Sequence, residues 1–431
     1  MMSHCKRRIL GLLLPAATVL LLASGCGSGG GPNVILILID TLRADHVHCY
    51  GYERMITPHL DSLASQGVRW TDCQAQSSWT LPAMTSIFTG TTERAHGAGA
   101  RGERLYGIGE ELVTLPEAYS AMGYSTYGIY NAPVMDVEYG FASGVDSVDT
   151  EGCTDVLDAE VVVDRTLSWI DSDADGPFFA VAHFFDPHWP YCAPDGPQDL
   201  ADVPASAIRA ANAHGDLNRD QAIALIDYYD AEIRYCDREL GRLFAGLRER
   251  GLDENTIVVV VADHGEEFLD HGMMFHGRQL FQETVHVPLI ISGPGVPRGD
   301  VVTEVVGQYD IMPTLMHLTD GQVPRQVQGV SLLPAAASPH EGVPSSGVNT
   351  GLKQRAAVRF DSLKVLWDAD ADSSWTYDLS LGIEDPDEAL TPDSAHVEKV
   401  QRYWSTPYIT EPPHVEVGDE KARWFRDMAY I

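Results

Sequence analysis

Basic residues are scarce in this chain. It has 29 Lys and Arg residues against 62 Asp and Glu residues, and no run of basic residues follows Arg8. A surface with a net charge of −33 repels nucleic acid and anionic lipid, so we expect no nucleic-acid partner. An anionic ligand would need a local positive centre, which a bound divalent cation can supply inside a cleft. The alternative is that the acidity belongs only to a solvated or salt-adapted surface.

Apolar segments long enough to cross a membrane are missing after residue 22. Residues 1–25 are predicted to be a signal peptide, because three basic residues precede an apolar run over residues 9–22 that is too short to span a bilayer. The stretch Leu22-Ala-Ser-Gly-Cys26 resembles a bacterial lipobox, which would lipidate Cys26. Ala23 stands where that pattern prefers Leu, so ordinary secretion or an uncleaved anchor is the alternative. Residues 26–32 would then be a flexible tether, and we predict an exported bacterial lipoprotein anchored in the membrane by its lipid, on the periplasmic or cell-surface side.

Cysteines spaced like a zinc knuckle or a redox pair are also missing. Besides Cys26, the exported chain would keep Cys49, Cys73, Cys153, Cys192 and Cys236. The export compartment permits one or two disulfides, and the odd number leaves at least one thiol free.

Three apolar runs have the composition of strands buried on both faces of a sheet. They cover residues 33–39, 178–185 and 256–261, and helical periodicity fills the gaps, most clearly over residues 219–250. This alternation predicts an α/β fold with a large, mostly parallel central sheet flanked by helices. Such sheets bind ligands beyond the carboxyl ends of their strands. Three groups of polar residues stand there and are expected to converge: Asp40, Asp186-Pro187-His188 and Asp263-His264.

The C-terminal part of the chain is predicted to be a separate, smaller unit. Residues 335–350 are rich in Pro, Ser, Ala and Gly, which indicates a linker or long loop after a catalytic domain over residues 33–334. The rest, residues 351–431, is predicted to be a small α+β subdomain. Its expected short strands and helix cover residues 356–367, 373–379 and 396–404.

Asp40, Asp263 and His264 supply two carboxylates and an imidazole at strand ends, which suits a divalent cation. For Asp40 alone, a turn or helix cap is the better interpretation. Its partnership with Asp-His-Gly at the end of another buried strand favours the metal site.

Thr80 directly precedes a predicted helix that runs to about Thr89. A hydroxyl there lies at the positive end of the helix dipole, beside backbone amides that can hold an anion. A plain N-cap is the alternative.

The other histidines divide into structural residues and candidate functional residues. His46, His48, His183 and His286 lie in or beside turns and apolar segments, and we interpret them as structural. His271 and His276 flank a loop just after the metal motif and are better candidates.

Ten stretches of this chain resemble, in order, the signatures of the sulfatase family within the alkaline-phosphatase-like superfamily. Any one motif is weak, but the ordered set covers nearly the whole exported chain. The matching stretches are residues 33–45, 57–64, 79–82, 89–90, 96–97, 183–191, 262–266, 287–290, 375–379 and 384–388.

The resemblance implies an alkaline-phosphatase-like fold and a site for one or two divalent cations (Mn, Zn, Ca or Mg). It implies Asp40, Thr80, Asp263 and His264 as metal ligands, Thr80 as nucleophile and His188 as a contact or proton donor to the ester. His276 falls where relatives carry an anion-binding Lys and is predicted to be catalytic. The residues predicted to bind substrate are Asn131, His271 and Arg278.

Three departures from the family pattern affect the expected chemistry. The formylglycine maturation motif, CxPxR or SxPxR, is replaced by Thr80-Leu-Pro-Ala-Met84. Thr41 replaces the second Asp of the usual pair, which favours a smaller or softer ion such as Mn²⁺ or Zn²⁺. Tyr130-Asn131 replaces a Lys and His pair.

The missing formylglycine precursor favours phosphoryl over sulfuryl chemistry. A formylglycine hydrate expels sulfate by collapsing to the aldehyde, and a sulfated Thr has no such exit. A phosphorylated Thr can be cleared by in-line displacement, and Thr is the nucleophile in phosphoryl-transferring branches of the superfamily. We therefore predict a hydrolase or transferase acting through Thr80 on a small anionic or envelope-derived ester. The alternatives are a true sulfuric ester hydrolase and a non-catalytic, metal-containing envelope binding protein.

Overall fold

The computed structural model describes residues 30–102, 104–174, 176–194, 196, 219–334, 340–347, 354–382, 384–418 and 421. The predicted signal peptide, Cys26 and most of the tether lie outside the described residues. Residues 31–431 cluster as one compact unit. Within the described part of the chain, no helix is long and apolar enough to cross a membrane.

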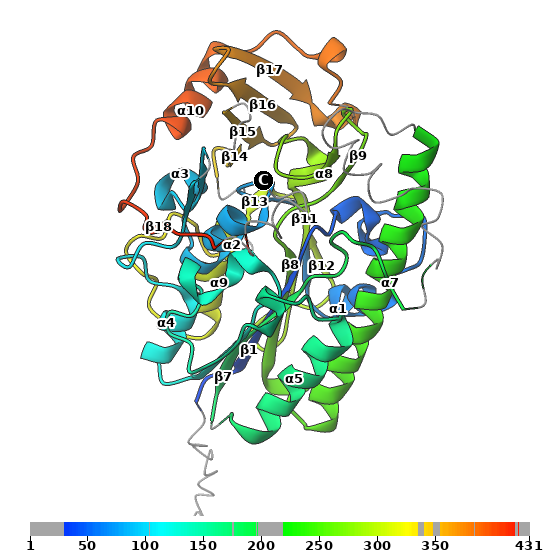
Figure 1. Ribbon diagram of the computed structural model, residues 1–431, viewed down its shortest axis with the longest axis vertical. Coiled ribbons are helices and arrows are strands. Elements are labelled where there is room, and N and C mark those ends of the chain that lie inside the picture. The colour runs from blue at the N-terminus through cyan, green and yellow to red at the C-terminus, as the bar shows by residue number, and fades with distance from the viewer. Residues whose placement is uncertain are drawn as a thin grey trace, which may run out of the picture. The chain divides into compact units, whose positions relative to one another are not determined.

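A mixed, mostly parallel sheet of nine described strands lies at the centre of the fold (Figure 1). Its strands are β1 (Asn33–Ile39), β2 (Val68–Gln74), β5 (Ser125–Ile129), β6 (Ser147–Asp149), β7 (Phe178–Phe184), β8 (Thr256–Ala262), β11 (His286–Ser292), β12 (Asp300–Val302) and β13 (Val306–Gly307). Their order is β12-β2-β11-β8-β1-β7-β5-β6, with β13 also pairing with β2. Only β11 runs antiparallel to its neighbours among these described strands. The predicted α/β class and large central sheet are confirmed.

The three central strands are the apolar runs seen in the sequence. Every residue of β1, β7 and β8 is buried, which requires cover on both faces of the sheet. β1 and β8 are rich in Val and Ile, and β7 has three Phe residues; branched and aromatic side chains suit a pleated surface. β1 pairs in parallel with β7 on one side and with β8 on the other, so their carboxyl ends meet at one edge.

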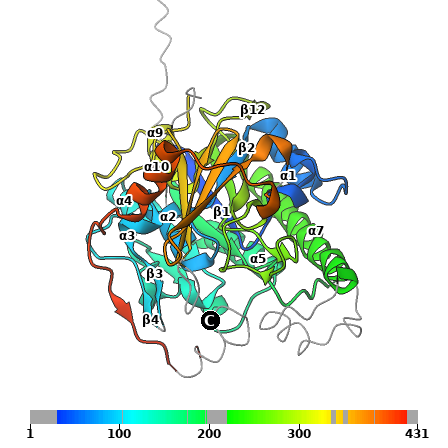
Figure 2. The same ribbon diagram turned by 90° about the horizontal axis from the view of Figure 1, so that it is seen from above.

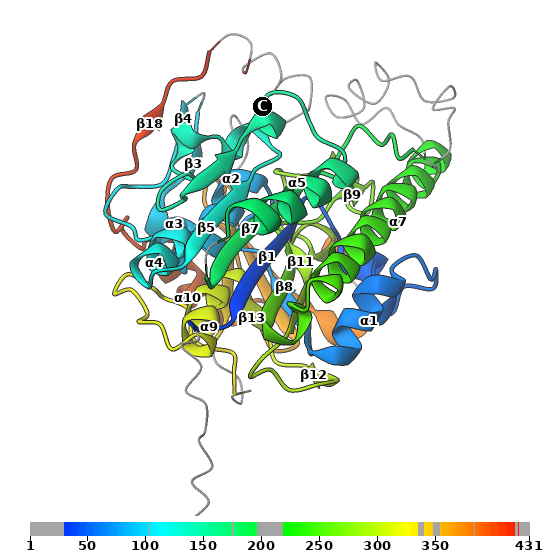
Figure 3. The same ribbon diagram turned by 90° about the horizontal axis from the view of Figure 1, so that it is seen from below.

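Helices cover both faces of the sheet (Figure 2, Figure 3). One group consists of α1 (Pro58–Gln66), α5 (Ala159–Ser172) and α7 (Arg219–Glu249). The other consists of α2 (Thr80–Thr89), α4 (Leu115–Ala121) and α9 (Ile311–Leu318). All ten residues of α2 are buried, so this helix runs through the interior beside the edge where the central strands end.

A second sheet follows the central one in the sequence. It is antiparallel, in the order β14 (Val343–Gly347), β15 (Arg355–Phe360), β16 (Leu363–Asp368) and β17 (Ser373–Asp378), and α10 (Ser394–Trp404) packs against it. The strands predicted over residues 356–367 are β15 and β16, separated by a turn at Asp361. β14 falls within residues 335–350, where the composition indicated a linker or loop.

Short elements connect these layers. β9 (Glu267–Phe268) and β10 (Met274–Phe275) form a hairpin just after β8, and α8 (Gln282–Val285) precedes β11. β3 (Gly99–Arg101), β4 (Arg104–Tyr106) and β18 (His414–Val415) form a small sheet that brings the C-terminal segment back to the main body, and α3 (Glu93–His96) precedes β3. The five described cysteines are all free thiols.

Candidate metal centre and active site

The register of the central sheet brings Asp40 and Asp263 together. Ile39 at the end of β1 is paired with Ala262 at the end of β8, so the residues that follow both strands emerge side by side. Both carboxylates and the adjacent His264 are fully buried. The prediction that these strand ends converge is confirmed for these three residues.

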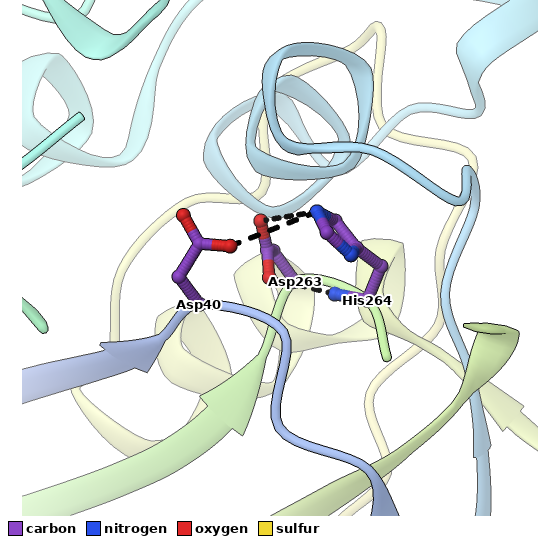
Figure 4. A group of neighbouring side chains, drawn as sticks. All are labelled: Asp40, Asp263 and His264. Carbon is purple, nitrogen blue, oxygen red and sulfur yellow. Dashed lines mark hydrogen bonds and ion pairs between the residues drawn. The ribbon is translucent and has the colours of Figure 1, made fainter. Parts of the chain in front are cut away.

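The three side chains point toward one another (Figure 4). His264 Nε2 lies 3.3 Å from Asp263 Oδ2 and 3.7 Å from Asp40 Oδ1. His264 Nδ1 lies 2.9 Å from the Gly265 carbonyl oxygen. Because a carbonyl can only accept, Nδ1 carries a proton, and Nε2 is the ring nitrogen that faces the carboxylates.

This donor set fits a divalent cation. A ring nitrogen of His264 and carboxylate oxygens of Asp40 and Asp263 lie within 4.8 Å of one another, and a cation or a proton among them offsets the repulsion between the carboxylates. Burial raises the pKa of Asp263, although the charge of His264, the amides of His264 and Thr41 and the hydroxyl of Thr80 favour its charged form. The other ring nitrogen of His264 donates to a backbone carbonyl, as in metal-bound histidines.

Thr80 lies at the first position of α2 and faces this group. Its Oγ1 is 3.3 Å from His264 Nε2. The N-cap of α2 is Trp79, whose side chain makes no capping hydrogen bond, so Thr80 does not serve as the N-cap that was the alternative. Its hydroxyl lies at the positive end of the helix, where a negative charge is stabilised.

Thr41 is held in an unusual backbone conformation beside Asp40. Its φ is 56°, in the left-handed region that a β-branched residue rarely adopts. Its N–H donates to Asp263 Oδ1 at 3.1 Å, and its carbonyl accepts from the Tyr229 hydroxyl at 2.6 Å. Residues kept in such a conformation by their surroundings are concentrated at functional sites.

Gly265 is required by a close backbone approach. A Cβ at this position would lie 2.0 Å from the carbonyl oxygen of Glu283. The Gly265 N–H also donates to the Thr284 carbonyl at 2.9 Å. The Gly of the Asp-His-Gly motif therefore lets the segment around α8 pack directly against the metal-binding residues.

Both histidines predicted to be catalytic, His188 and His276, lie near this group. The His276 ring centroid is 4.4 Å from that of His264 and 5.0 Å from that of His188. Burial lowers the pKa of His188 and of His276 well below the ordinary value, and neighbouring histidines lower both further. His188 Nδ1 contacts the Trp189 carbonyl oxygen, which can only accept, so Nδ1 carries a proton.

A buried pair of polar side chains supports His276. Its Nδ1 lies 2.9 Å from Glu266 Oε1, and Glu266 Oε2 accepts from the Tyr191 hydroxyl at 3.2 Å. Burial raises the pKa of Glu266 to about 8. Sequence analysis missed Glu266 and Tyr191, although Glu266 directly follows Asp-His-Gly.

His183, interpreted as structural, lies against the candidate metal ligands. Its Nε2 is 3.7 Å from Asp40 Oδ2, and its Nδ1 accepts from the Asn131 N–H at 3.2 Å. That acceptor role places the ring proton on Nε2, toward Asp40. The sequence did hold a signal for this role. His183 lies one residue before the end of β7, and β7 pairs with β1, which Asp40 directly follows.

The three residues predicted to bind substrate have different surroundings. The Asn131 amide donates to the Leu157 carbonyl at 2.7 Å and accepts from its N–H at 2.8 Å, so it fixes a loop. Arg278 is half-buried, and its charge contributes to the lowered pKa of His276, after burial and His264. His271 belongs to a separate group of potential metal ligands, with Glu267 and Glu283.

Comparisons with known proteins give the family and the fold of this chain. Residues 32–321 match the profile of the Sulfatase family. An arylsulfatase of Clostridium perfringens is 26% identical over 376 residues, covering 70% of this chain and 77% of that enzyme. A putative sulfatase structure from Bacteroides thetaiotaomicron has a TM-score of 0.70 at 20% identity, covering 86% of this chain and 90% of the other. The phosphonate monoester hydrolase of Silicibacter pomeroyi has a TM-score of 0.69 at 20% identity, covering 86% and 93%.

The fold and the homologues define an ester hydrolase on an alkaline-phosphatase-like sheet. This chain belongs to the sulfatase family.

Proposed function

We propose that this protein is a metal-dependent hydrolase or transferase of anionic esters, with phosphoryl chemistry through Thr80 favoured over sulfuryl chemistry. The observation that carries this is the position of Thr80, whose hydroxyl lies 3.3 Å from His264 Nε2 at the N-terminus of a buried helix. The likeness to an arylsulfatase and to the fold of a phosphonate monoester hydrolase supports an ester substrate.

Asp40, Thr80, Asp263 and His264 would hold the cation. A divalent ion bound there would draw charge from the ester oxygens and favour the deprotonated hydroxyl of Thr80. The imidazole in the ligand set favours Mn²⁺ or Zn²⁺ over Ca²⁺.

Each step of the reaction is assigned to residues of this chain. Thr80 Oγ1, deprotonated as the bound ion would favour, forms a bond to phosphorus while the bond to the leaving oxygen breaks. His188 gives that oxygen a proton from Nε2. Water then attacks the phosphothreonine and gives its proton to His188, and the phosphorus–Oγ1 bond breaks, which restores the deprotonated Thr80. The negative charge of the bound ester favours the protonated ring of His188 that this sequence of steps needs.

Sulfate is the less favoured ester because Thr80 has no aldehyde-forming exit. Membership of the sulfatase family still makes a sulfuric ester hydrolase the second candidate. The Thr41 and Tyr130-Asn131 replacements favour a third, a binding protein that keeps the metal site without turnover.

Intact-mass and elemental analysis after brief exposure to an aryl phosphate, and separately to an aryl sulfate, distinguishes the three. We expect a stoichiometric divalent metal and a phosphate adduct that maps to Thr80. Turnover of the aryl sulfate and not of the aryl phosphate would show that the protein is a sulfuric ester hydrolase, the second candidate. Bound metal without adduct or product from either ester would make the binding protein the better assignment.

A further inference from the structure

A second group of potential ligands lies outside the site of Asp40, Asp263 and His264. One atom from each of Glu267, His271 and Glu283 lies within 4.8 Å of the others. Glu267 is fully buried and Glu283 nearly so, whereas His271 is partly exposed. The residues come from the β9–β10 hairpin and from α8, so two segments meet at this group.

The His271 ring directs its Nδ1 atom into the group. Its Nε2 lies 3.0 Å from the carbonyl oxygen of Glu384, which can only accept, so Nε2 carries a proton. Nδ1 then faces the Glu283 carboxylate, with which it is in contact. Burial lowers the pKa of His271, but the hydrogen bond and charge of Glu283 outweigh it and raise that pKa, so a proton lies between Nδ1 and the carboxylate unless a cation replaces it. An imidazole whose other N–H donates to a carbonyl is the usual arrangement of a metal-bound histidine.

Glu267 adds an acceptor that the described residues do not satisfy. Its Oε1 accepts from Gln279 Nε2 at 3.1 Å, whereas its Oε2 is buried and meets no hydrogen-bond donor in the described chain. Burial, then the charges of Glu283 and Asp270 and a hydrogen bond with Glu283, raise the pKa of Glu267 well above its ordinary value, so Glu267 holds a proton when no cation is bound. Arg278 is close enough for Glu267 to raise its pKa, against the larger effect of burial.

We propose that Glu267, His271 and Glu283 bind a second divalent cation of the Zn²⁺ or Mn²⁺ class. Two carboxylates and an imidazole are a mixed oxygen and nitrogen set, which suits those ions better than Ca²⁺. A surface cleft lined by Asp270, His271, Glu283 and Glu384 gives an ion a route from solvent.

An ion at this place would join the β9–β10 hairpin to α8. The hairpin is flanked by Glu266 and His276, and the Glu283 carbonyl packs against Gly265. The second ion would therefore fix the segments that support the first site, while its own ligands remain separate from Asp40, Asp263 and His264.

Equilibrium dialysis against Zn²⁺ with elemental analysis, together with anomalous scattering at the zinc edge from Zn²⁺-soaked crystals, tests this assignment. We expect the wild type to show anomalous density between Glu267, His271 and Glu283. Glu267→Gln should bind one ion fewer, with affinity at this place weakened by at least about 100-fold, and should keep the density at Asp263. Glu411→Gln is the matched control, because that exposed carboxylate pairs with Arg101 at 3.0 Å and lies outside both the group and its cleft; it should retain both ions.

Thermal unfolding shows whether the variant is intact. In chelator, Glu267→Gln should melt no lower than wild type, because the amide can donate to Glu283 as the protonated Glu267 does. Wild type should then gain more stability from added Zn²⁺ than the variant does. Equal Zn²⁺ stoichiometry in wild type and Glu267→Gln, or no anomalous density at the three residues, would overturn the second site and leave a shared proton as the link between the carboxylates.

Discussion

The Thr80 hydroxyl lies 3.3 Å from Nε2 of His264, although 184 residues separate the two in the chain. β8 ends just before His264 and α2 begins at Thr80, so the contact joins the edge of the sheet to the N-terminus of a buried helix. A nucleophile and a metal ligand are thereby placed within reach of one ester.

Replacing Thr80 tests its role as nucleophile. We expect Thr80→Ala to lower kcat by at least about 1,000-fold, because no hydroxyl remains to attack. Thr80→Ser should retain measurable turnover, since it keeps the hydroxyl. Steady-state assays with aryl phosphate and metal analysis of each variant check this, and unchanged turnover in Thr80→Ala would refute the assignment.

Removing charge from Asp263 should weaken metal binding. We expect Asp263→Asn to raise the Kd for Mn²⁺ by at least about 100-fold, because a carboxylate ligand becomes a neutral amide. Asp45→Asn serves as the control, since the side chain of Asp45 is exposed and its carboxylate pairs with Arg43 at 2.8 Å. Isothermal titration calorimetry would contradict the ligand set if both variants bound Mn²⁺ alike.

The Glu266 carboxylate should matter through His276. Glu266→Gln replaces the acceptor that orients the His276 ring at 2.9 Å, and we expect kcat/KM to fall by about 10- to 100-fold. The pH profile of kcat/KM should shift along the pH axis in Glu266→Gln. A purely structural role would lower the stability of the protein and leave that profile unchanged.

Glu93 should make the protein less stable as pH rises. Burial raises its pKa from 4.5 to about 7, with Arg94 and Arg101 opposing the shift. Between these values the folded chain holds a proton that the unfolded chain releases, so the free energy of unfolding falls through this window and levels off above pH 7. Relative to Glu93→Gln, wild type should lose about 3 kcal/mol, at about 1.4 kcal/mol per pKa unit. Urea unfolding in chelator across this pH range measures the difference, and parallel curves for the two proteins would contradict it.

A side chain at position 265 should be poorly tolerated. The Cβ of Gly265→Ala would meet the Glu283 carbonyl at 2.0 Å, so the segment around α8 must move. We expect a loss of about 1–3 kcal/mol in stability and weaker metal binding. Gly382→Ala is not a suitable control, because its φ of 71° adds backbone strain; Gly418→Ala, which has open space around it, is the better one.

The central sheet and the candidate metal ligands at its edge could be predicted because each depends on a local sequence pattern. Buried runs of Val and Ile end at Asp40 and at Asp263-His264, and parallel strands place such ends at one edge. β14 was not expected, because Val343–Gly347 has Pro, Ser and Gly where a strand usually has branched side chains, and it is held by pairing with β15.

The sequence by itself determined the α/β class, the strand ends that carry Asp40, Asp263 and His264, and the start of a helix at Thr80, since periodicity and residue type specify these locally. Only the tertiary structure decided which side chains support them. His183 faces Asp40, Glu266 supports His276, and Glu267 meets His271 and Glu283. These contacts depend on side-chain direction and on how neighbouring segments pack, and neither leaves a periodic trace in the chain.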